Sequence, residues 1–161
     1  MIYRVLRTVL KQKKDPGLYE YLDHHMHLSN NLYNATLFRI RQNFTSRKKE
    51  HPTENELEVQ REIEETLELC PHLKRPKSVL GYKFLERMMR VMDNPDFFAG
   101  LPSQTAEECQ KAAVHDFRSW LASLREYKKH PEKYLGKTEN ATLIRRNVRI
   151  STITFSNQGC K

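Results

Sequence analysis

A helical periodicity from Leu18 to about Phe44 constrains the fold more than any other feature of the sequence. Apolar or small residues recur there in steps of three and four, which places them on one side of a helix of about seven turns. These residues are Leu18, Leu22, Met26, Ser29, Tyr33, Leu37, Ile40 and Phe44. Histidine, asparagine and arginine occupy the other sides. The pattern predicts a long amphipathic helix that is apolar on one side and polar to basic on the other.

Three further helices are predicted downstream. An acidic helix follows the proline at position 52, with Thr53 or a neighbour as its cap, and ends near Leu69. A short amphipathic helix ends before the sequence DNP at 93–95, and a long helix begins near Pro102 and Ser103. The long helix has its apolar residues in register at Ala106, Cys109, Ala113, Phe117, Trp120, Leu124 and Tyr127.

The two ends of the chain have strand-like patterns. Alternate residues of 2–11 would fall on two opposite faces, and the β-branched and aromatic content of this segment favours a strand, although a short helix is compatible too. The segment 148–155 alternates in the same way and is rich in β-branched residues. The expected fold class is therefore α+β, with a bundle of about four helices, two of them long, inserted into a split and incomplete β-unit. The expected boundaries are a first strand over 1–14, a helical bundle over 15–130 and returning strands over 131–161.

The charge distribution predicts a polyanionic partner. The net charge is +8, but eight glutamates and one arginine lie between Glu50 and Leu69. Outside that window, 27 Lys and Arg face 12 Asp and Glu, or +15 over 141 residues. Basic side chains at phosphates release counterions, so this balance favours nucleic acid, while a merely soluble basic protein remains the alternative.

Composition also bears on the setting of the protein. No stretch approaches the roughly 20 apolar residues of a membrane span, and the N-terminus lacks the pattern of a signal peptide. Three distant cysteines argue against a disulfide framework, so we expect a cytoplasmic protein, associated with the nucleoid when it is bound to DNA.

The sequence DHHMH at 23–27 raises the question of a metal site. His24 and His27 would share a helix face with Glu20, which makes a three-ligand site possible, but no dedicated metal-binding spacing is present. Solvated or phosphate-facing imidazoles are the preferred interpretation. Cys109 and His115 fall on different faces of one helix, with Cys109 in the apolar register. We therefore expect no catalytic residues, no metal and no cofactor.

Basic residues interleaved with aromatic residues and amides favour nucleic-acid binding. Arg and Lys hold phosphates, and Asn or Gln can pair with base edges. Any single member could instead be an ordinary surface residue or a helix cap. The candidate nucleic-acid-binding residues are Arg4, Arg7, Lys11, Tyr33, Asn34, Lys74, Arg75, Lys77, Ser103 and Gln104.

Several motifs occur in the order seen in one family. They are YRVLRTVLK at 3–11, LSNNLYNATLFRIRQ at 28–42, the segment from NPDFF to YLGK at 94–137, and STITFSNQGCK at 151–161. Over nearly its whole length the chain resembles the N-terminal portion of TnpB-type insertion-sequence proteins, which are related to type V CRISPR effector nucleases. The run GKTENATLIRRNVRIS departs from the family pattern.

The resemblance implies a wedge-like β-barrel, split in sequence, with the helical recognition bundle inserted after its first strand. It also implies that this half binds guide RNA of the omega type and a duplex target DNA. Tyr33, Asn34, Ser103 and Gln104 would contact nucleic acid, and Arg4, Arg7 and Lys11 would face guide RNA or the backbone. The family's catalytic residues and zinc finger would lie beyond Lys161, in a downstream or separate nuclease domain, so we expect no enzyme activity from this chain.

Two other readings of the sequence remain open. In the first, the chain is a non-catalytic helical protein-interaction module whose acidic segment from Glu54 to Glu68 docks a basic partner. In the second, it is a small metalloenzyme that uses the histidines.

Overall fold

A computed structural model describes residues 9–136 of the chain, and every regular element within this range is helical. The elements are α1 (Pro16–Ser46), α2 (Glu54–Leu69), α3 (Tyr82–Val91), α4 (Ser103–Lys129) and a short 3₁₀ turn, η1 (Pro131–Lys133). All four helices predicted from periodicity and capping signals are thereby confirmed. No helix within residues 9–136 is long and apolar enough to cross a bilayer.

The prediction of an α+β fold with a split β-barrel is wrong, because residues 9–136 contain no strand. Residues 12–14 form a turn, in which the backbone N–H groups of Lys14 and Asp15 both donate to the carbonyl of Lys11. An alternating pattern forms a strand only where a neighbouring strand accepts its hydrogen bonds, and this part of the chain offers none. The predicted strand segments 1–8 and 148–155 lie outside the described residues.

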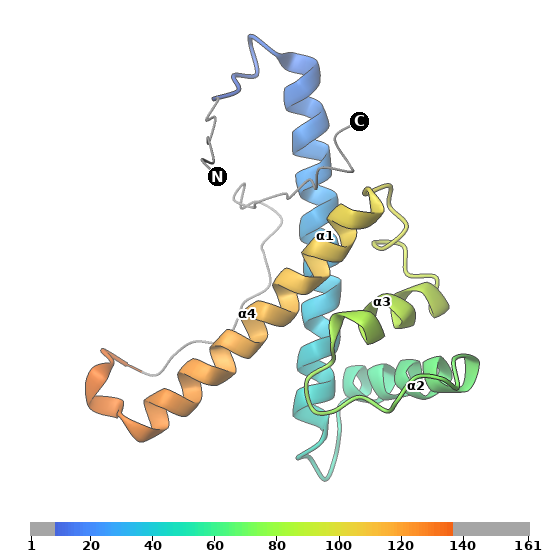
Figure 1. Ribbon diagram of the computed structural model, residues 1–161, viewed down its shortest axis with the longest axis vertical. Coiled ribbons are helices and arrows are strands. Elements are labelled where there is room, and N and C mark those ends of the chain that lie inside the picture. Colours follow the sequence, from blue (N-terminus) through green and yellow to red (C-terminus); the bar gives the residue numbers. More distant parts are fainter. Residues whose placement is uncertain (1–8, 137–161) are drawn as a thin grey trace, which may run out of the picture.

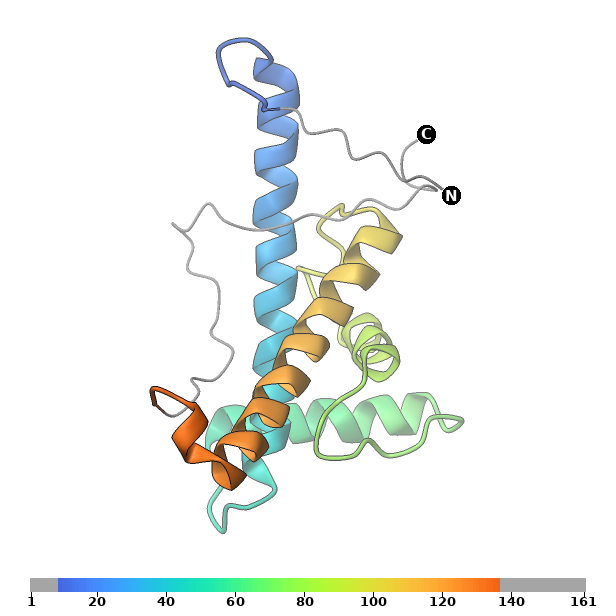
Figure 2. The ribbon, with the colours of Figure 1, turned by 60° about the vertical axis from the view of Figure 1, so that its left-hand side comes forward.

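The four helices enclose one core (Figures 1 and 2). The long helix α1 is crossed by α4, which runs in the same general direction, and α2 lies across the C-terminal end of α1. Helix α3 packs between α2 and α4 and completes the arrangement. The first turns of α1 and the last turns of α4 extend beyond the crossing (Figure 1). The buried residues of α1 accordingly lie between His25 and Ser46, and those of α4 between Thr105 and Phe117.

The core is built where the apolar sides of the four helices meet. Its largest cluster contains Leu37, Ile40, Val59, Ile63, Leu80, Phe84, Leu85, Met88, Ala113, Val114 and Phe117. The predicted register of α4 is confirmed, because Ala106, Cys109, Ala113 and Phe117 are all buried. Trp120 lies at the edge of the same cluster, with its ring centroid 5.3 Å from that of Phe117.

The buried side of α1 is broader than the predicted stripe. Leu18, which was expected to belong to it, is 49 % exposed, whereas Thr36 and Asn43 are buried. These polar residues fit because they are hydrogen-bonded, as buried polar groups generally are. Thr36 Oγ1 donates to the carbonyl of Leu32 at 2.7 Å, and Asn43 Nδ2 donates to the carbonyl of Ser78 at 2.9 Å. Helix α1 contacts both α2 and α4, which widens the face that it must bury.

An ion pair joins α1 to α2 and corrects the expectation that Arg39 lies on a solvent-facing side. Arg39 Nε donates to Glu62 Oε2 at 2.8 Å, and its Nη2 donates to Glu62 Oε1 at 2.7 Å. The two side chains are only 10 % and 13 % exposed. This bidentate geometry is the strong form of an arginine–carboxylate contact. Arg39 is therefore a structural residue of the α1–α2 contact.

The N-terminus of α2 is held by the buried carboxylate of Glu56. This carboxylate accepts a hydrogen bond from the backbone N–H of Thr53 at 2.8 Å, which is one of the two bonds of the capping box that Thr53 and Glu56 form. It also accepts a hydrogen bond from Thr45 Oγ1 at 2.5 Å. Lys49 Nζ lies 2.8 Å from the same carboxylate. Contacts with Lys49, Thr45 and Thr53 lower the pKa of Glu56 from 4.5 to about 2.

This depressed pKa predicts a contribution to stability that depends on pH. The ionised Glu56 stabilises the fold above pH 4.5, its ordinary pKa, and that stabilisation is lost as the pH falls toward about 2. Glu56→Gln should therefore be less stable than wild type at neutral pH, with the difference shrinking through this interval. Urea unfolding midpoints across the interval measure it. Glu58→Gln, at an exposed glutamate on the same helix, is the control, and an equal pH dependence in both variants would contradict the assignment.

Candidate nucleic-acid interface

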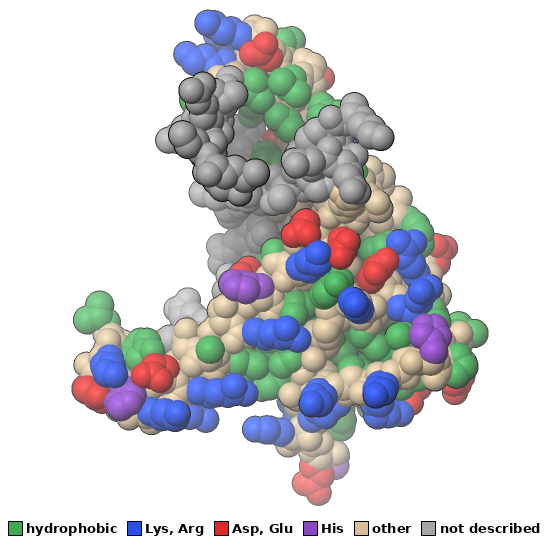
Figure 3. Space-filling view, viewed as in Figure 1, with side chains coloured by type: hydrophobic (Ala, Val, Ile, Leu, Met, Phe, Trp, Pro, Cys, Tyr) green, Lys and Arg blue, Asp and Glu red, His purple; other side chains and the backbone are tan. Residues whose placement is uncertain are grey.

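Exposed Lys and Arg side chains gather over three parts of the chain, the loop at residues 70–81, helix α3 and the second half of α4 (Figure 3). We call the exposed cations of these elements the basic face. Its members are Lys74, Arg75, Lys77, Lys83, Arg87, Arg90, Arg118, Arg125, Lys128 and Lys129. Arg75 and Arg90 are paired with glutamates, and the other eight form no ion pair within residues 9–136. These eight cations are the groups available to phosphates.

The loop at 70–81 is fixed by side chains from the end of α1. Asn43 Nδ2 donates to the carbonyls of Lys77 and Ser78, and Arg47 Nη2 donates to the carbonyl of Pro76 at 2.8 Å. These bonds hold the backbone while the side chains of Lys74 and Lys77 stay exposed. A fixed backbone that carries free ammonium groups lowers the ordering cost of binding a polyanion.

Arg75 is the one predicted loop residue whose charge is already engaged. Its Nη1 donates to Glu64 Oε1 at 2.6 Å, and its Nη2 contacts the other carboxylate oxygen. The contact with Arg75 lowers the pKa of the Glu64 carboxyl. Both side chains are exposed, so the pair is a surface contact, but it partly neutralises Arg75. Lys74 and Lys77 are the stronger candidates.

Tyr33 lies away from the basic face. Its hydroxyl donates to Asp116 Oδ2 at 2.8 Å. Its half-buried ring packs against the largest core cluster and against a smaller one, which contains Leu32, Met89, Leu101, Ala106 and Cys109. Burial first, and then Asp116, raises the pKa of Tyr33. Asp116 and Arg118 are two residues apart on α4 and hence about 160° apart around the helix. Asn34 follows on the same helix and is half-buried, so the structure does not bring this pair to the cations of α4.

We expect Tyr33→Phe to affect stability and to leave nucleic-acid affinity unchanged. The substitution removes one hydrogen bond, which typically contributes about 0.5–1.5 kcal/mol, while it keeps the packed ring. Thermal unfolding and a binding isotherm on the same preparation measure both effects. Tyr127→Phe is the control, since the ring of Tyr127 packs against Tyr134 at the far end of α4. A selective loss of affinity in Tyr33→Phe would instead place its hydroxyl at the nucleic acid.

Ser103 and Gln104 occupy the first turn of α4. Together with Arg90 and Phe97 they line a small hollow of about 260 Å³, in which the Arg90 guanidinium lies 4.8 Å from the centre of the Phe97 ring. Positions 104, 111, 118 and 125 recur every two turns, so Gln104 faces the same side of α4 as Arg118. The two are about 21 Å apart along the axis, and Gln104 is therefore at the periphery of the basic face.

The remaining predicted residues lie elsewhere. Lys11 is exposed ahead of α1, at the end of that helix opposite to α2 (Figure 1), and is thus far from the loop cations. Arg4 and Arg7 lie outside the described residues. Arg87, Arg118 and Arg125 were not among the residues predicted from the sequence. Gln104, Lys111, Arg118 and Arg125 follow one another at intervals of seven residues, which places them on one side of a helix.

The three histidines of the segment 23–27 are not all solvated, because His25 is buried whereas His24 and His27 are exposed. His25 is buried, and its Nδ1 donates to the carbonyl of Tyr21 at 2.8 Å, while its ring packs 4.0 Å from the Tyr21 ring. His27 lies 3.6 Å from Asp23, and His24 is exposed. Within residues 9–136 no group of three or more His, Cys, Asp or Glu side chains is arranged to hold a metal ion.

Cys109 is a core residue, as its register predicted. Its Sγ donates to the carbonyl of Ser29 at 3.0 Å, and burial raises the pKa of the thiol. A protonated, buried thiol is a poor nucleophile. His115 is exposed on another side of α4 and does not contact it.

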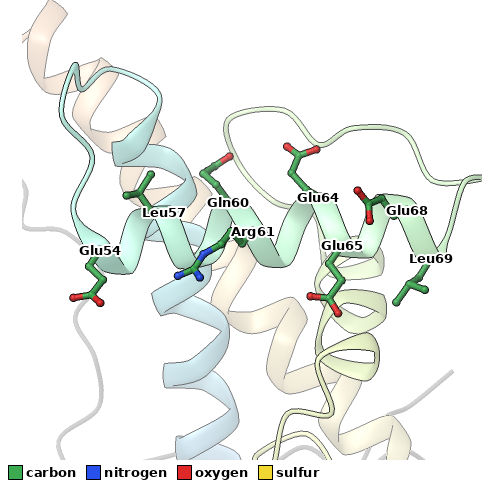
Figure 4. A pocket seen from close by; sticks show the side chains of 8 residues that line it. All are labelled: Glu54, Leu57, Gln60, Arg61, Glu64, Glu65, Glu68 and Leu69. Carbon is green, nitrogen blue, oxygen red and sulfur yellow. The ribbon is translucent and has the colours of Figure 1, made fainter.

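The outer side of α2 forms the acidic counterpart of the basic face. A shallow groove runs along it, lined by Glu54, Leu57, Gln60, Arg61, Glu64, Glu65, Glu68 and Leu69 (Figure 4). Leu57 and Leu69 are 49 % and 64 % exposed. Glu56, Glu62 and Glu64 are engaged by basic residues from outside the helix, whereas no ion pair within residues 9–136 engages Glu54, Glu65 or Glu68.

Residues 9–136 thus define an all-helical domain with one basic face and one acidic helix. No protein family matches the chain, and neither a curated protein nor a solved structure was found to match it.

Proposed function

We propose that this chain is a non-catalytic nucleic-acid-binding module that holds phosphates with its basic face. The observation that carries the proposal is the group of eight exposed cations on the 70–81 loop, α3 and α4 that have no ion pair within residues 9–136. Cations of this kind release condensed counterions when they meet a phosphate backbone, which provides affinity without sequence readout.

The separation of charge within the fold supports the same function. Helix α2 contains seven of the chain's glutamates and one arginine, and three of these glutamates form ion pairs with Arg39, Lys49 and Arg75. The rest of the described range contains 20 Lys and Arg against 12 Asp and Glu, and 17 of these cations form no ion pair with α2. Residues 1–8 and 137–161 add seven basic residues and one acidic residue to the sequence. The positive charge is therefore available to a polyanion outside α2.

The sequence resemblance to TnpB-type proteins supports a more specific form of this proposal. In that form the module serves a transposon-encoded, RNA-guided DNA endonuclease, and it binds the scaffold of a guide RNA and the motif beside a duplex target. The nuclease activity would belong to a separate or downstream domain. Helices α1 to α4 would form the part that recognises nucleic acid. The β-barrel that the resemblance implied is not part of this proposal.

A salt series tests the proposed function. The affinity for a short duplex DNA and for a structured RNA should fall steeply as the salt concentration rises. On duplex DNA, a plot of the logarithm of the binding constant against the logarithm of the salt concentration should have a slope of about −0.9 for each phosphate contacted. We expect a slope of about −3.6 if half of the eight cations that form no ion pair within residues 9–136 contact phosphates, and a steeper slope if more of them do. A flat salt dependence, or no binding to either ligand at low salt, would refute the proposal.

A variant in which four cations of the basic face are replaced by glutamine locates the interface. Lys74→Gln, Lys77→Gln, Arg118→Gln and Arg125→Gln combined should weaken binding and reduce the slope by about 3 to 4 on duplex DNA. The matched control combines Lys13→Gln, Lys14→Gln, Lys48→Gln and Arg61→Gln, which removes the same charge from exposed positions outside the basic face. Equal losses in both variants would mean that net charge alone governs binding.

The outer side of α2 favours a second candidate function, a helical protein-interaction module. Glu54, Glu65 and Glu68, which form no ion pair in the described part of the chain, and the exposed Leu57 and Leu69 suit a basic, partly apolar partner segment. This function would be supported if Glu54→Gln with Glu65→Gln and Glu68→Gln abolished a defined, stoichiometric protein complex while nucleic-acid binding was absent in the wild type.

A further inference from the structure

A hollow of about 410 Å³ opens between the first residue of α3 and the outer side of α4. Its inner surface includes the half-buried Tyr82, the buried Val114 and the exposed Ala122. Its rim includes three cationic or potentially cationic groups, Lys111, His115 and Arg118. An apolar floor beside cations is the arrangement that a nucleotide requires, because a nucleotide presents an aromatic base next to a negative phosphate.

The three rim groups are not equivalent. Lys111 Nζ is held by Glu107 at 3.0 Å and by Glu108 at 2.9 Å, and it lies 5.1 Å from the centre of the Tyr82 ring. These contacts neutralise Lys111 and fix it against the ring, so it forms part of the wall.

The other two groups remain accessible. His115 is 79 % exposed and lies 3.5 Å from Asp116, a long contact. Arg118 is exposed and has no ion pair within the described range, which makes its guanidinium the group available to a phosphate. Arginine suits that role because its planar group can donate two parallel hydrogen bonds to phosphate oxygens.

We propose that this hollow holds one nucleotide of a single-stranded nucleic acid, with the phosphate at Arg118 and the base or sugar against Tyr82, Val114 and Ala122. The proposal rests on the proposed function and adds the class of partner. Bases in a duplex are paired and stacked inside the helix, so they do not enter a surface hollow. Bases of a single strand can be splayed out and packed against an aromatic side chain.

Ala122→Trp tests the proposal, because a tryptophan at this exposed lining residue would fill the hollow without removing a contact of the core. The probes are a labelled oligothymidylate of about 15 nucleotides and a labelled duplex of the same length, titrated at one low salt concentration. We expect Ala122→Trp to weaken single-strand binding about tenfold and to change duplex binding less than twofold. Ala112→Trp places the same side chain at an exposed position on another side of α4 and should change neither.

A second substitution covers the possibility that the new tryptophan disturbs the fold. If the melting temperature of Ala122→Trp falls, Arg118→Gln provides the same comparison at an exposed residue, and it should weaken single-strand binding more than duplex binding. Equal effects on the two probes, or equal effects of Ala122→Trp and Ala112→Trp, would overturn the inference and leave the proposed function standing. Absence of binding to both probes in the wild type would instead count against the proposed function itself.

Discussion

Phe117→Ala is expected to lower the free energy of unfolding by about 3–5 kcal/mol, the usual cost of truncating a fully buried aromatic side chain. Phe117 is 0 % exposed and belongs to the largest core cluster. Its ring centroid lies 5.3 Å from those of both Phe44 and Trp120. Removing it leaves a cavity between α1 and α4 that rigid helices can fill only in part. A domain of this size is marginally stable, so a loss of this magnitude would consume much of its stability.

The measurement is urea unfolding followed by far-ultraviolet circular dichroism, because the fluorescence of Trp120 would itself respond to the loss of its neighbour. Phe98→Ala is the control. Phe98 is 52 % exposed and packs edge-on against Phe97, so its truncation should cost less than about 1 kcal/mol. Similar losses in the two variants would show that Phe117 does not occupy the packed interior.

Arg39→Ala should cost about 3–5 kcal/mol, because it leaves the carboxylate of Glu62 without its partner at a largely buried position. The desolvated charge, more than the lost attraction, produces this cost. A double variant with Arg39→Met and Glu62→Leu removes both charges and should recover stability to within about 1 kcal/mol of wild type. The same comparison would show whether the ion pair is needed for the α1–α2 contact or only tolerated there.

Arg75→Ala is the matched control for Arg39→Ala, since it removes an arginine from an exposed pair with another glutamate of α2. Surface pairs contribute about 0–1 kcal/mol, so the change in the urea midpoint should be small. If Arg39→Ala were as mild as Arg75→Ala, the Arg39–Glu62 pair would be more open to solvent than its 10 % and 13 % exposed side chains indicate.

The positions of the four helices could be predicted because their signals are local. The periodicity from Leu18 in α1, the cap at or near Thr53 before α2 and Pro102 before α4 are signals within the sequence itself. The register of α4 was predicted for the same reason, since residues three and four apart necessarily share a face. The strand prediction for 1–14 was wrong within the described part, because a strand depends on a distant partner and not on its own alternation.

The candidate site was only partly predictable. Lys74 and Lys77 were identified from the run of charge in which they lie, and the structure leaves them exposed. Tyr33 was selected for its neighbourhood in the sequence, but its hydroxyl is bonded to Asp116, 83 residues further along the chain. Arg118 and Arg125 were missed because their seven-residue spacing places them on one side of a helix without showing whether that side is covered, which only the packing of α4 decides.

The sequence by itself determined the helices and the total charge, since both follow from residue identity and from spacings within a few positions. Only the tertiary structure decided which charges remain available. Glu62 of α2 buries Arg39 and Glu64 engages Arg75, across separations of 23 and 11 residues. Lys77 and Arg118 meet no carboxylate in the described range and remain exposed. The physical reason is that helix formation depends on neighbours in the chain, whereas the partner of a charge depends on which helix faces pack together.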